Sequence, residues 1–350
     1  MATIREARRD DNAGLLALTA ATPMGGAIAV RSDRYPDFFR LLERRGPSRT
    51  LVAEQDGAIV GCVSANRVPV YVEGVPEEVH YLGDLKVHPD LRRSGIAAGL
   101  LKAMEADLRA AGADLVLCTA ALGNDRVRPY LEGRAGLPRT AALGVYKVFQ
   151  LVPRRRAGSD GAFEIGEASE NPEMVELYSE HFREYQFGPL VGPGTLRGAR
   201  HWVARADGAV QAALSLVDVG DSRQNVIVRL SPLLSVLVPV LRAARRVAPL
   251  PDLPRQGEPI RTLYIKALAC RPGREPALDL LVERARHQAF LEGYHFVTAG
   301  FHERDPHGDR LAKGLKFTFK SLGYVLGLRR SRGELESLTR RVPYEDYSLV

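Results

Sequence analysis

Residues 81–108 contain the side chains and spacing that point most directly to chemistry. Residues 81–89 are typical of a strand that ends at a proline, residues 90–97 of a tight loop, and residues 98–108 of a helix with apolar side chains at helical spacing. In a strand–loop–helix unit the backbone N–H groups of the loop point into one concavity, and the helix dipole adds positive potential there. The segment therefore predicts a site for a polyanionic ligand.

Three side chains of this loop suit a phosphate-bearing ligand. Gly95 lets the backbone approach a pyrophosphate closely, and Arg92 and Arg93 add positive charge. The segment is not a Walker loop, because it contains no Gly-Lys-Ser/Thr sequence. The preceding strands read as an antiparallel meander, and no acidic residue ends a parallel strand about twenty residues further on, which excludes a Rossmann fingerprint. The plainer alternative is an ordinary helix start with Ser94 as the N-cap.

The pattern Arg92-x-x-Gly95-x-Ala97, which follows Val87-x-Pro89, resembles the Q/R-x-x-G-x-G/A signature of the GNAT acyltransferases. The resemblance covers the first half of the chain, including its order of strands and helices. It implies that the loop binds the pyrophosphate of acyl-coenzyme A, and that the strand before the loop splays from the next strand to admit the pantetheine arm. The cofactor-binding residues that it implies are Leu85, Lys86, Val87, Arg92, Arg93, Ser94, Gly95, Ile96, Ala97 and Asn124.

The chemistry of the family is acyl transfer to an amine. It needs an oxyanion donor, a route to deprotonate the ammonium and an acid for the leaving thiolate. By resemblance, the backbone N–H groups near residues 85–87 polarise the thioester carbonyl. Cys62 and Cys118 lie in the middle of predicted strands without a His partner, so we expect direct attack in a ternary complex with acetyl-CoA.

The general base is less clearly marked in the sequence. The position eleven residues before the motif arginine, where several family members carry a base, is Tyr81, and tyrosine is a poor base at neutral pH. Asp84 is the nearest carboxylate, but strand alternation turns it away from Tyr81 unless a β-bulge intervenes. A structural ion pair is an equal alternative for Asp84. His80 and Glu78 are further candidates, and a chain of water molecules is another.

The predicted acid is Tyr130, which lies in a segment similar to the family pattern N-x-x-A-x-x-L-Y-x-x-x-G-F. Here the tyrosine comes one residue early, Pro129 precedes it and Leu137 replaces the phenylalanine. We expect Pro129 to end or kink the helix, which would shift the ring. The alternative is that Tyr130 is a packing side chain, in which case Asn124 still contacts the pantetheine.

Four short matches in the same order indicate that the chain contains one fold twice. The clearest match pairs residues 52–58 with residues 203–209, and the others pair 4–7 with 165–168, 87–89 with 270–272, and 143–145 with 322–324. We therefore predict an α/β (α+β) protein made of two tandem GNAT folds, each with a mixed, mostly antiparallel sheet flanked by helices. The predicted ranges are 1–153 for the first copy, 154–161 for a linker, and 162–350 for the second copy with an insertion at about 220–258.

The predicted elements of the first copy are a mixture of strands and helices. We expect strands at 3–6, 50–55, 58–72, 77–88, 114–119 and 143–152, and helices at 11–20, 33–45, 94–111 and 125–132. In the second copy the loop at 271–279 is three residues shorter, lacks the G-x-G/A pattern and carries Pro276, which removes a backbone donor. The second copy should therefore not hold coenzyme A.

Composition excludes several classes of protein. A hydrophobic fraction of 45% and a charged fraction of 26% are ordinary globular values, which exclude a disordered chain, a fibre and a multispan membrane protein. The net charge of +7 is not concentrated in a stripe, so we expect no nucleic-acid partner. The three cysteines are too scattered for a zinc site, and His302 and His307 are five residues apart, off the spacing of a helical metal site. We expect no metal.

The remaining predictions concern location and partners. The charged N-terminus lacks the apolar core of a signal peptide, so we expect a cytoplasmic protein without a membrane span, as a monomer or homodimer. The expected acceptor is a small-molecule amine or a protein lysine. Two alternatives remain open: a non-catalytic acyl-CoA sensor, and a transferase for longer acyl chains that uses residues 230–248 as a lid.

Overall fold

The structure is a computed structural model. It describes residues 2–350 apart from 24–27, 125–126, 134–139, 157, 159–160, 231–234, 236–237, 241, 243–251 and 312. In the described part of the chain, no helix is long and apolar enough to cross a membrane. Most of the segment 230–248, the hypothetical lid over a longer acyl chain, lies outside the described residues.

The elements of the first half follow the predicted order, with one addition. They are β1 (Thr3–Glu6), α1 (Asn12–Ala20), β2 (Ile28–Asp33), α2 (Phe39–Arg45), β3 (Ser48–Gln55), β4 (Ala58–Val72), β5 (Val75–Val87), α3 (Ile96–Ala110), β6 (Leu115–Ala121), α4 (Arg128–Leu131) and β7 (Ala141–Leu151). The helix expected at 33–45 begins only at Phe39, because Asp33 belongs to β2 and residues 34–38 form a turn. That strand had no local signal, since its partner comes from the second half of the chain.

The second half has a related but not identical order of strands and helices. Its elements are β8 (Glu164–Ala168), α5 (Pro172–Arg183), β9 (Gly188–Pro189), β10 (Arg200–Ala206), β11 (Ala209–Asp218), β12 (Gln224–Leu230), β13 (Pro259–Ile260), β14 (Thr262–Cys270), α7 (Glu275–Leu291), β15 (Phe296–His302), α8 (Pro306–Leu311), β16 (Lys316–Gly327) and α9 (Arg332–Ser337).

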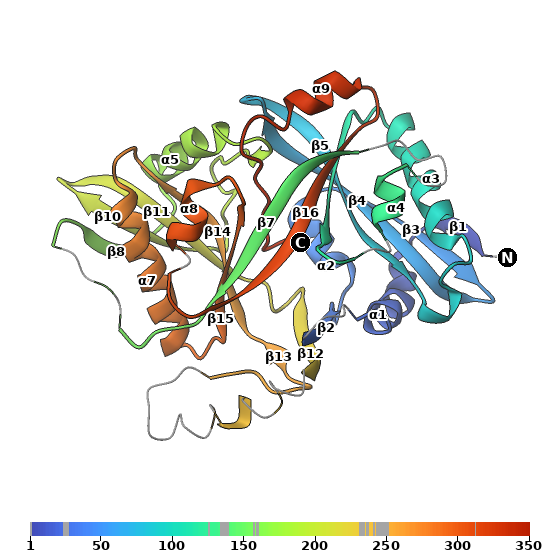
Figure 1. Ribbon diagram of the computed structural model, residues 1–350, viewed down its shortest axis with the longest axis horizontal. Coiled ribbons are helices and arrows are strands. Elements are labelled where there is room, and N and C mark those ends of the chain that lie inside the picture. The colour runs from blue at the N-terminus through green and yellow to red at the C-terminus, as the bar shows by residue number, and fades with distance from the viewer. Residues whose placement is uncertain are drawn as a thin grey trace.

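A single large, mostly antiparallel sheet runs through the whole molecule (Figure 1). Its strand order is β1-β3-β4-β5-β6-β16-β7-β15-β14-β11-β10-β8. The last strand of each half is exchanged: β16 lies between β6 and β7, and β7 lies between β16 and β15. Neither half completes its own sheet, so the ranges 1–153 and 162–350 remain a prediction about repeat units rather than about separate sheets.

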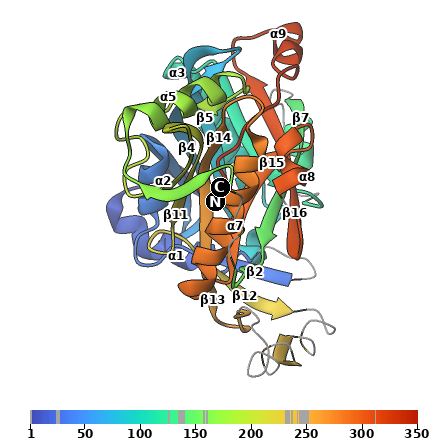
Figure 2. The same ribbon diagram turned by 90° about the vertical axis from the view of Figure 1, so that its left-hand side faces the viewer.

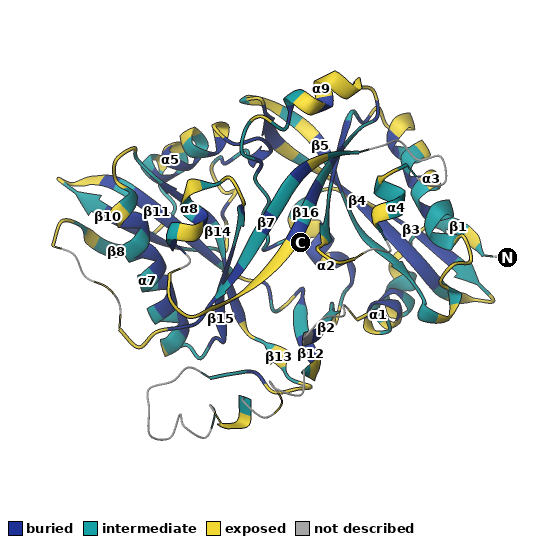
Figure 3. Ribbon diagram, viewed as in Figure 1, coloured by how far each residue is buried: buried dark blue, intermediate teal, exposed yellow. Residues whose placement is uncertain are grey.

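Helices cover both faces of the sheet, and the strand sequences show why. On β3, Leu51 and Ala53 pack with α3, whereas Val52 between them packs with α1 and α2. Both faces are buried, so the strand is apolar without alternation. The buried residues accordingly line the strands and the inner faces of the helices (Figure 3).

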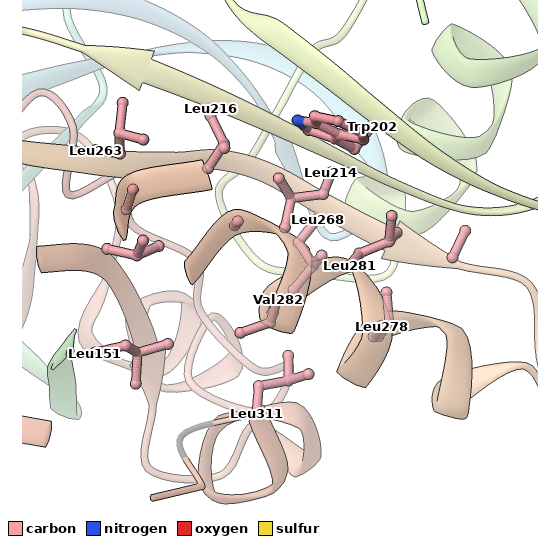
Figure 4. Close-up of a cluster of buried hydrophobic side chains, with 14 of the residues drawn as sticks. Leu151, Trp202, Leu214, Leu216, Leu263, Leu268, Leu278, Leu281, Val282 and Leu311 are labelled. Atoms are coloured by element: carbon pink, nitrogen blue, oxygen red, sulfur yellow. The ribbon is translucent and has the colours of Figure 1, made fainter. Parts of the chain in front are cut away.

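The second half is built in the same way around α7. Leu214 and Leu216 of β11 pack with Leu278, Leu281 and Val282 of α7, beside the indole of Trp202 (Figure 4). The other face of β11 packs on α5 through Val210 and Ala213. This half therefore has a complete core, although its loop at 271–279 is predicted not to hold coenzyme A.

A second, three-stranded sheet joins the two halves at one end of the molecule. Its order is β13-β12-β2, and it lies below the main sheet in Figure 1 and again in Figure 2. Strands β12 and β13 belong to the region predicted as an insertion, and β12 pairs antiparallel with β2. The insertion therefore packs against the α1–α2 connection of the first half.

Candidate functional site

Strands β5 and β6 separate at the point where the resemblance places the pantetheine arm. Their parallel pairing is confined to His80 with Val116 and Tyr81 with Leu117. Beyond these pairs, residues 82–87 of β5 pair with β4, and residues 118–121 of β6 pair with β16. The two strands therefore open toward their carboxyl ends, as the sequence predicted.

A β-bulge lies in β5 beside this opening. Ser64 pairs with Gly83 and Cys62 with Lys86, so two residues of β5 stand opposite one residue of β4. Asp84 is in this bulge and has a φ of +54°. The β-bulge on which the predicted orientation of Asp84 toward Tyr81 depended is thus present. It places the carboxylate in a buried position.

Asp84 forms an ion pair with two cations. Its Oδ2 lies 2.8 Å from Nη1 of Arg34 and its Oδ1 lies 2.9 Å from Nζ of Lys86, with only 6% of the side chain exposed. Burial alone would raise the pKa of this carboxyl, but the charges of Arg34 and Lys86 outweigh that effect and hold the pKa below its usual range. A carboxylate held ionised in this way is a weak base. The geometry therefore favours the structural ion pair over the base role predicted for Asp84.

Tyr81 lies at the vertex of the opening. Its hydroxyl is 2.7 Å from Oγ1 of Thr119, and the guanidinium of Arg45 lies 3.7 Å from the centre of its ring. Burial raises the pKa of Tyr81 well above the ordinary tyrosine value, so the hydroxyl stays protonated near neutral pH. Tyr81 is thus in the predicted place, but its chemistry there is that of a hydrogen-bonded phenol and not of a base.

The predicted anion loop joins β5 to α3. Gly95 is the N-cap residue of α3 with a φ of +86°, and Arg93 has a φ of +72°. The alternative in which Ser94 caps the helix is wrong, because the N-cap residue is Gly95, which has no side chain. Among the described residues, no side-chain hydrogen bond reaches the first N–H groups of the helix. Arg92, Arg93, Ser94 and Gly95 are exposed, and a Cβ at Gly95 would meet no atom within 4 Å.

The predicted acid is on the short helix α4. Pro129 stands in the first turn of this helix, which begins at Arg128 and continues to Leu131. A missing N–H is tolerated there, so the expectation that Pro129 ends or kinks the helix is wrong. Tyr130 is partly exposed, and Asn124 is exposed before the helix. Residues 125–126 and 134–139 lie outside the described part, Leu137 among them. The catalytic role of Tyr130 stays a prediction.

The loop of the second half differs in the way the sequence indicated. Only residues 271–274 separate β14 from α7, whereas residues 88–95 separate β5 from α3. Pro276 lies in the first turn of α7 and has no N–H to offer. That this half holds no coenzyme A stays a prediction.

The second half nevertheless has an opening of its own, and the C-terminal tail, residues 342–350, lies in it. Strands β14 and β15 pair only over residues 262–264 and 296–298. The hydroxyl of Tyr344 donates to the carbonyl of Lys266 at 3.1 Å, and the ring of Tyr347 packs directly on Gly300. Side chains of the tail thus occupy the space that corresponds to the pantetheine gap of the first half.

Sequence reasoning missed Glu345, which this tail carries to the vertex of the first opening. Glu345 lies within electrostatic reach of Arg45, Tyr81 and Cys118. Burial, only partly offset by Arg45, raises the pKa of Glu345 to about 7. The residue is only partly exposed to solvent. No local signal could have shown this, because the tail has no periodicity and is far from Tyr81 in the sequence.

His302 and His295 both have backbone partners. His302 contacts the carbonyl of Leu143 at 3.0 Å through Nε2, and Nδ1 of His295 lies 2.9 Å from the backbone nitrogen of Arg261. Over the described residues, no group of three or more His, Cys, Asp or Glu side chains is placed to hold a metal ion.

Comparisons with known proteins agree with this geometry. Residues 17–136 match the family model described as Acetyltransferase (GNAT) family. No curated protein matches the sequence. Among solved structures, N-myristoyltransferase of Saccharomyces cerevisiae with bound myristoyl-CoA is similar with a TM-score of 0.61 at 12% identity, over 95% of this chain and 84% of that chain.

Two bacterial structures are similar over a comparable length. A GCN5-related N-acetyltransferase from Anabaena variabilis matches with a TM-score of 0.55 at 10% identity, over 94% of this chain and 73% of that one. A probable N-acyltransferase from Enterococcus faecalis matches with a TM-score of 0.52 at 10% identity, over 94% and 72%. At these identities the likeness concerns the fold. Residues 17–136 thus match the model of the GNAT acetyltransferase family, and the fold of the whole chain is similar to that of these N-acyltransferase structures.

Proposed function

We propose that the protein transfers acetyl from acetyl-CoA to a primary amine, on a small molecule or a protein lysine, by direct attack in a ternary complex. The observation that carries this proposal is the uncapped start of α3 behind Gly95, placed at the open end of the β5–β6 gap. N–H groups at a helix start bind phosphates, and the gap leads from them to the vertex at Tyr81.

Each predicted residue has a role in this proposal. Arg92, Arg93, Ser94, Gly95, Ile96 and Ala97 bind the pyrophosphate, Asn124 contacts the pantetheine, and backbone N–H groups of Leu85, Lys86 and Val87 polarise the thioester carbonyl. Tyr130 donates a proton to the leaving thiolate. Asp84 holds the bulge through Arg34 and Lys86, and Tyr81 closes the vertex, so both act by positioning.

The two cysteines near the gap suit direct attack. Burial raises the pKa of the Cys62 thiol to about 12 and that of the Cys118 thiol to about 12, so neither supplies a thiolate at neutral pH. We expect intact-mass spectrometry after incubation with acetyl-CoA to show no acylated protein, and Cys118→Ala to keep turnover. A stoichiometric mass increase that Cys118→Ala removes would show a covalent intermediate instead.

A transferase for longer acyl chains is the second candidate. It is favoured by the likeness to a myristoyl-CoA-bound N-myristoyltransferase over 95% of this chain. The two functions differ in how affinity depends on chain length. Each buried methylene adds about 0.8 kcal/mol, which is roughly a fourfold gain in affinity.

The deciding experiment compares acetyl-, butyryl-, octanoyl- and myristoyl-CoA in native mass spectrometry, followed by thiol-release assays on a panel of primary amines. For an acetyltransferase we expect one acetyl-CoA per chain, little gain in affinity with length, and turnover of acetyl-CoA with some amines. Affinity that climbs steadily to myristoyl-CoA would support the long-chain enzyme. Binding with no turnover of any amine would indicate the acyl-CoA sensor.

A further inference from the structure

We propose that the carboxylate of Glu345, which the C-terminal tail carries into the site from the second half of the chain, accepts the proton of the acceptor ammonium. This inference rests on the proposed N-acyltransferase function. It assigns the base that residues of β5 do not supply, since Asp84 is held in an ion pair and Tyr81 in a hydrogen bond.

The tail is fixed on both sides of Glu345. Before it, the backbone N–H of Tyr344 donates to the carbonyl of Gln186 at 2.8 Å. After it, Asp346 forms an ion pair with Lys266, and Arg45 donates to the carbonyl of Leu349. The C-terminus consequently lies near the middle of the molecule, between the two halves (Figure 1). A residue anchored on both flanks is held in place, as a catalytic base must be.

The neighbours of Glu345 place it at the vertex of the β5–β6 opening. Tyr81 takes part in the last pair between these strands, and Cys118 is the first residue of β6 beyond that pairing. Both interact electrostatically with Glu345. Arg45, which lies over the ring of Tyr81, also faces Glu345. Because Arg45 both donates to the carbonyl of Leu349 and lies over the ring of Tyr81, the tail segment that carries Glu345 passes beside the residue at which the gap begins.

The charged and titratable groups around Glu345 come from six parts of the fold. They are Arg45 of α2, Tyr81 of β5, Cys118 of β6, Tyr146 of β7, Lys266 of β14, and Tyr344, Asp346 and Tyr347 of the tail. Burial raises the pKa of the tyrosines and of the cysteine, so these groups stay neutral near pH 7. Arg45 and Lys266 lower the pKa of Glu345, whereas burial and Asp346 raise it.

A carboxyl whose pKa lies at about 7 is suited to this task. It is ionised often enough near neutral pH to accept a proton, and it is a stronger base than an exposed glutamate. Asp84 has the opposite environment, in which two cations lower its pKa and weaken it as a base. The two carboxyls thus differ in role because burial dominates for Glu345 and ion pairing dominates for Asp84.

The proton steps balance. Glu345 takes one proton from the ammonium and passes it to water. The freed lone pair of nitrogen forms the C–N bond at the thioester carbon, and the C–S bonding pair leaves with sulfur. The thiolate takes the hydroxyl proton of Tyr130. The attacking nitrogen releases its second proton to solvent, and a proton from solvent restores the hydroxyl of Tyr130. The products are the amide, the free thiol of coenzyme A and one proton.

The test measures kcat/KM from pH 5.5 to 9 for the full-length protein and for Glu345→Gln, with two amines of different pKa. For the wild type we expect activity to rise with pH through a midpoint near 7 that is the same for both amines, because Glu345 and not the amine controls it. In Glu345→Gln this rise of activity with pH should disappear, and kcat/KM should fall by about 10²- to 10⁴-fold. Native mass spectrometry should show unchanged acetyl-CoA binding.

Two further variants keep the test decisive. Glu345→Asp should keep the rise of activity with pH, at a reduced rate. If Glu345→Gln does not fold, this variant tests whether the carboxylate is the base. Asp346→Asn should move the rise to lower pH, because the Asp346 charge raises the pKa of Glu345. A Glu345→Gln variant that keeps both the rate and the rise with pH would overturn this inference alone. Wild-type protein that binds acetyl-CoA but acylates no amine would overturn the proposed function, and this inference with it.

Discussion

Gly95→Glu is expected to abolish acyl-CoA binding while the protein remains folded. Gly95 is the N-cap residue of α3 at a φ of +86°, and a side chain there would extend into open space at the mouth of the loop. A glutamate would place a negative charge where the pyrophosphate should bind. Like charges in contact cost several kcal/mol, so affinity should fall by at least about 100-fold. Native mass spectrometry with excess acetyl-CoA measures the loss.

Gly273→Glu is the matched control in the second half. Gly273 also has a positive φ, of +77°, and a Cβ there also meets open space, in the loop before α7. The two substitutions add the same charge and a comparable backbone strain. We expect Gly273→Glu to leave binding at one acetyl-CoA per chain. Two ligands on the wild type, or loss of binding in Gly273→Glu, would show that the second half holds the cofactor.

Asp84→Asn is expected to lower the free energy of unfolding by about 3 kcal/mol, because it removes the counter-charge from buried cations. The side chains of Arg34 and Asp84 are only 9% and 6% exposed, and Lys86 shares the same carboxylate. Denaturant unfolding followed by circular dichroism measures the difference. Asp33→Asn is the control, since its partner Arg31 is 36% exposed and such a pair contributes about 1 kcal/mol or less.

The pH dependence of stability separates these two variants further. The pKa of Asp84 is lowered in the folded state, so its contribution is fully present above the unfolded-state pKa of about 4 and is lost as pH falls through the lower folded-state value. Below about pH 4 the wild type should therefore lose more stability than Asp84→Asn. Equal stabilities of Asp84→Asn and Asp33→Asn at neutral pH would contradict the buried ion pair.

The cofactor loop could be predicted because its structure depends on neighbouring residues. The strand before Pro89, the glycine at position 95 and the apolar spacing of the helix are all local features of the sequence. The structure has this strand and helix, with Gly95 between them at a positive φ. The position of the bulge at Asp84 depends on how β5 pairs with β4, so the sequence could state it only as a condition. That Arg34 pairs with Asp84 could not be predicted from local features, because the two residues are fifty positions apart in the sequence.

The sequence by itself determined the order of strands and helices in the first half and the place of the strand–loop–helix motif, because these follow from local periodicity and turn residues. Only the tertiary structure decided that β7 and β16 exchange places, that β12 pairs with β2, and that the tail brings Glu345 to Tyr81. These contacts join segments far apart in the chain, and they form because buried polar strand edges must find partners wherever the fold provides them.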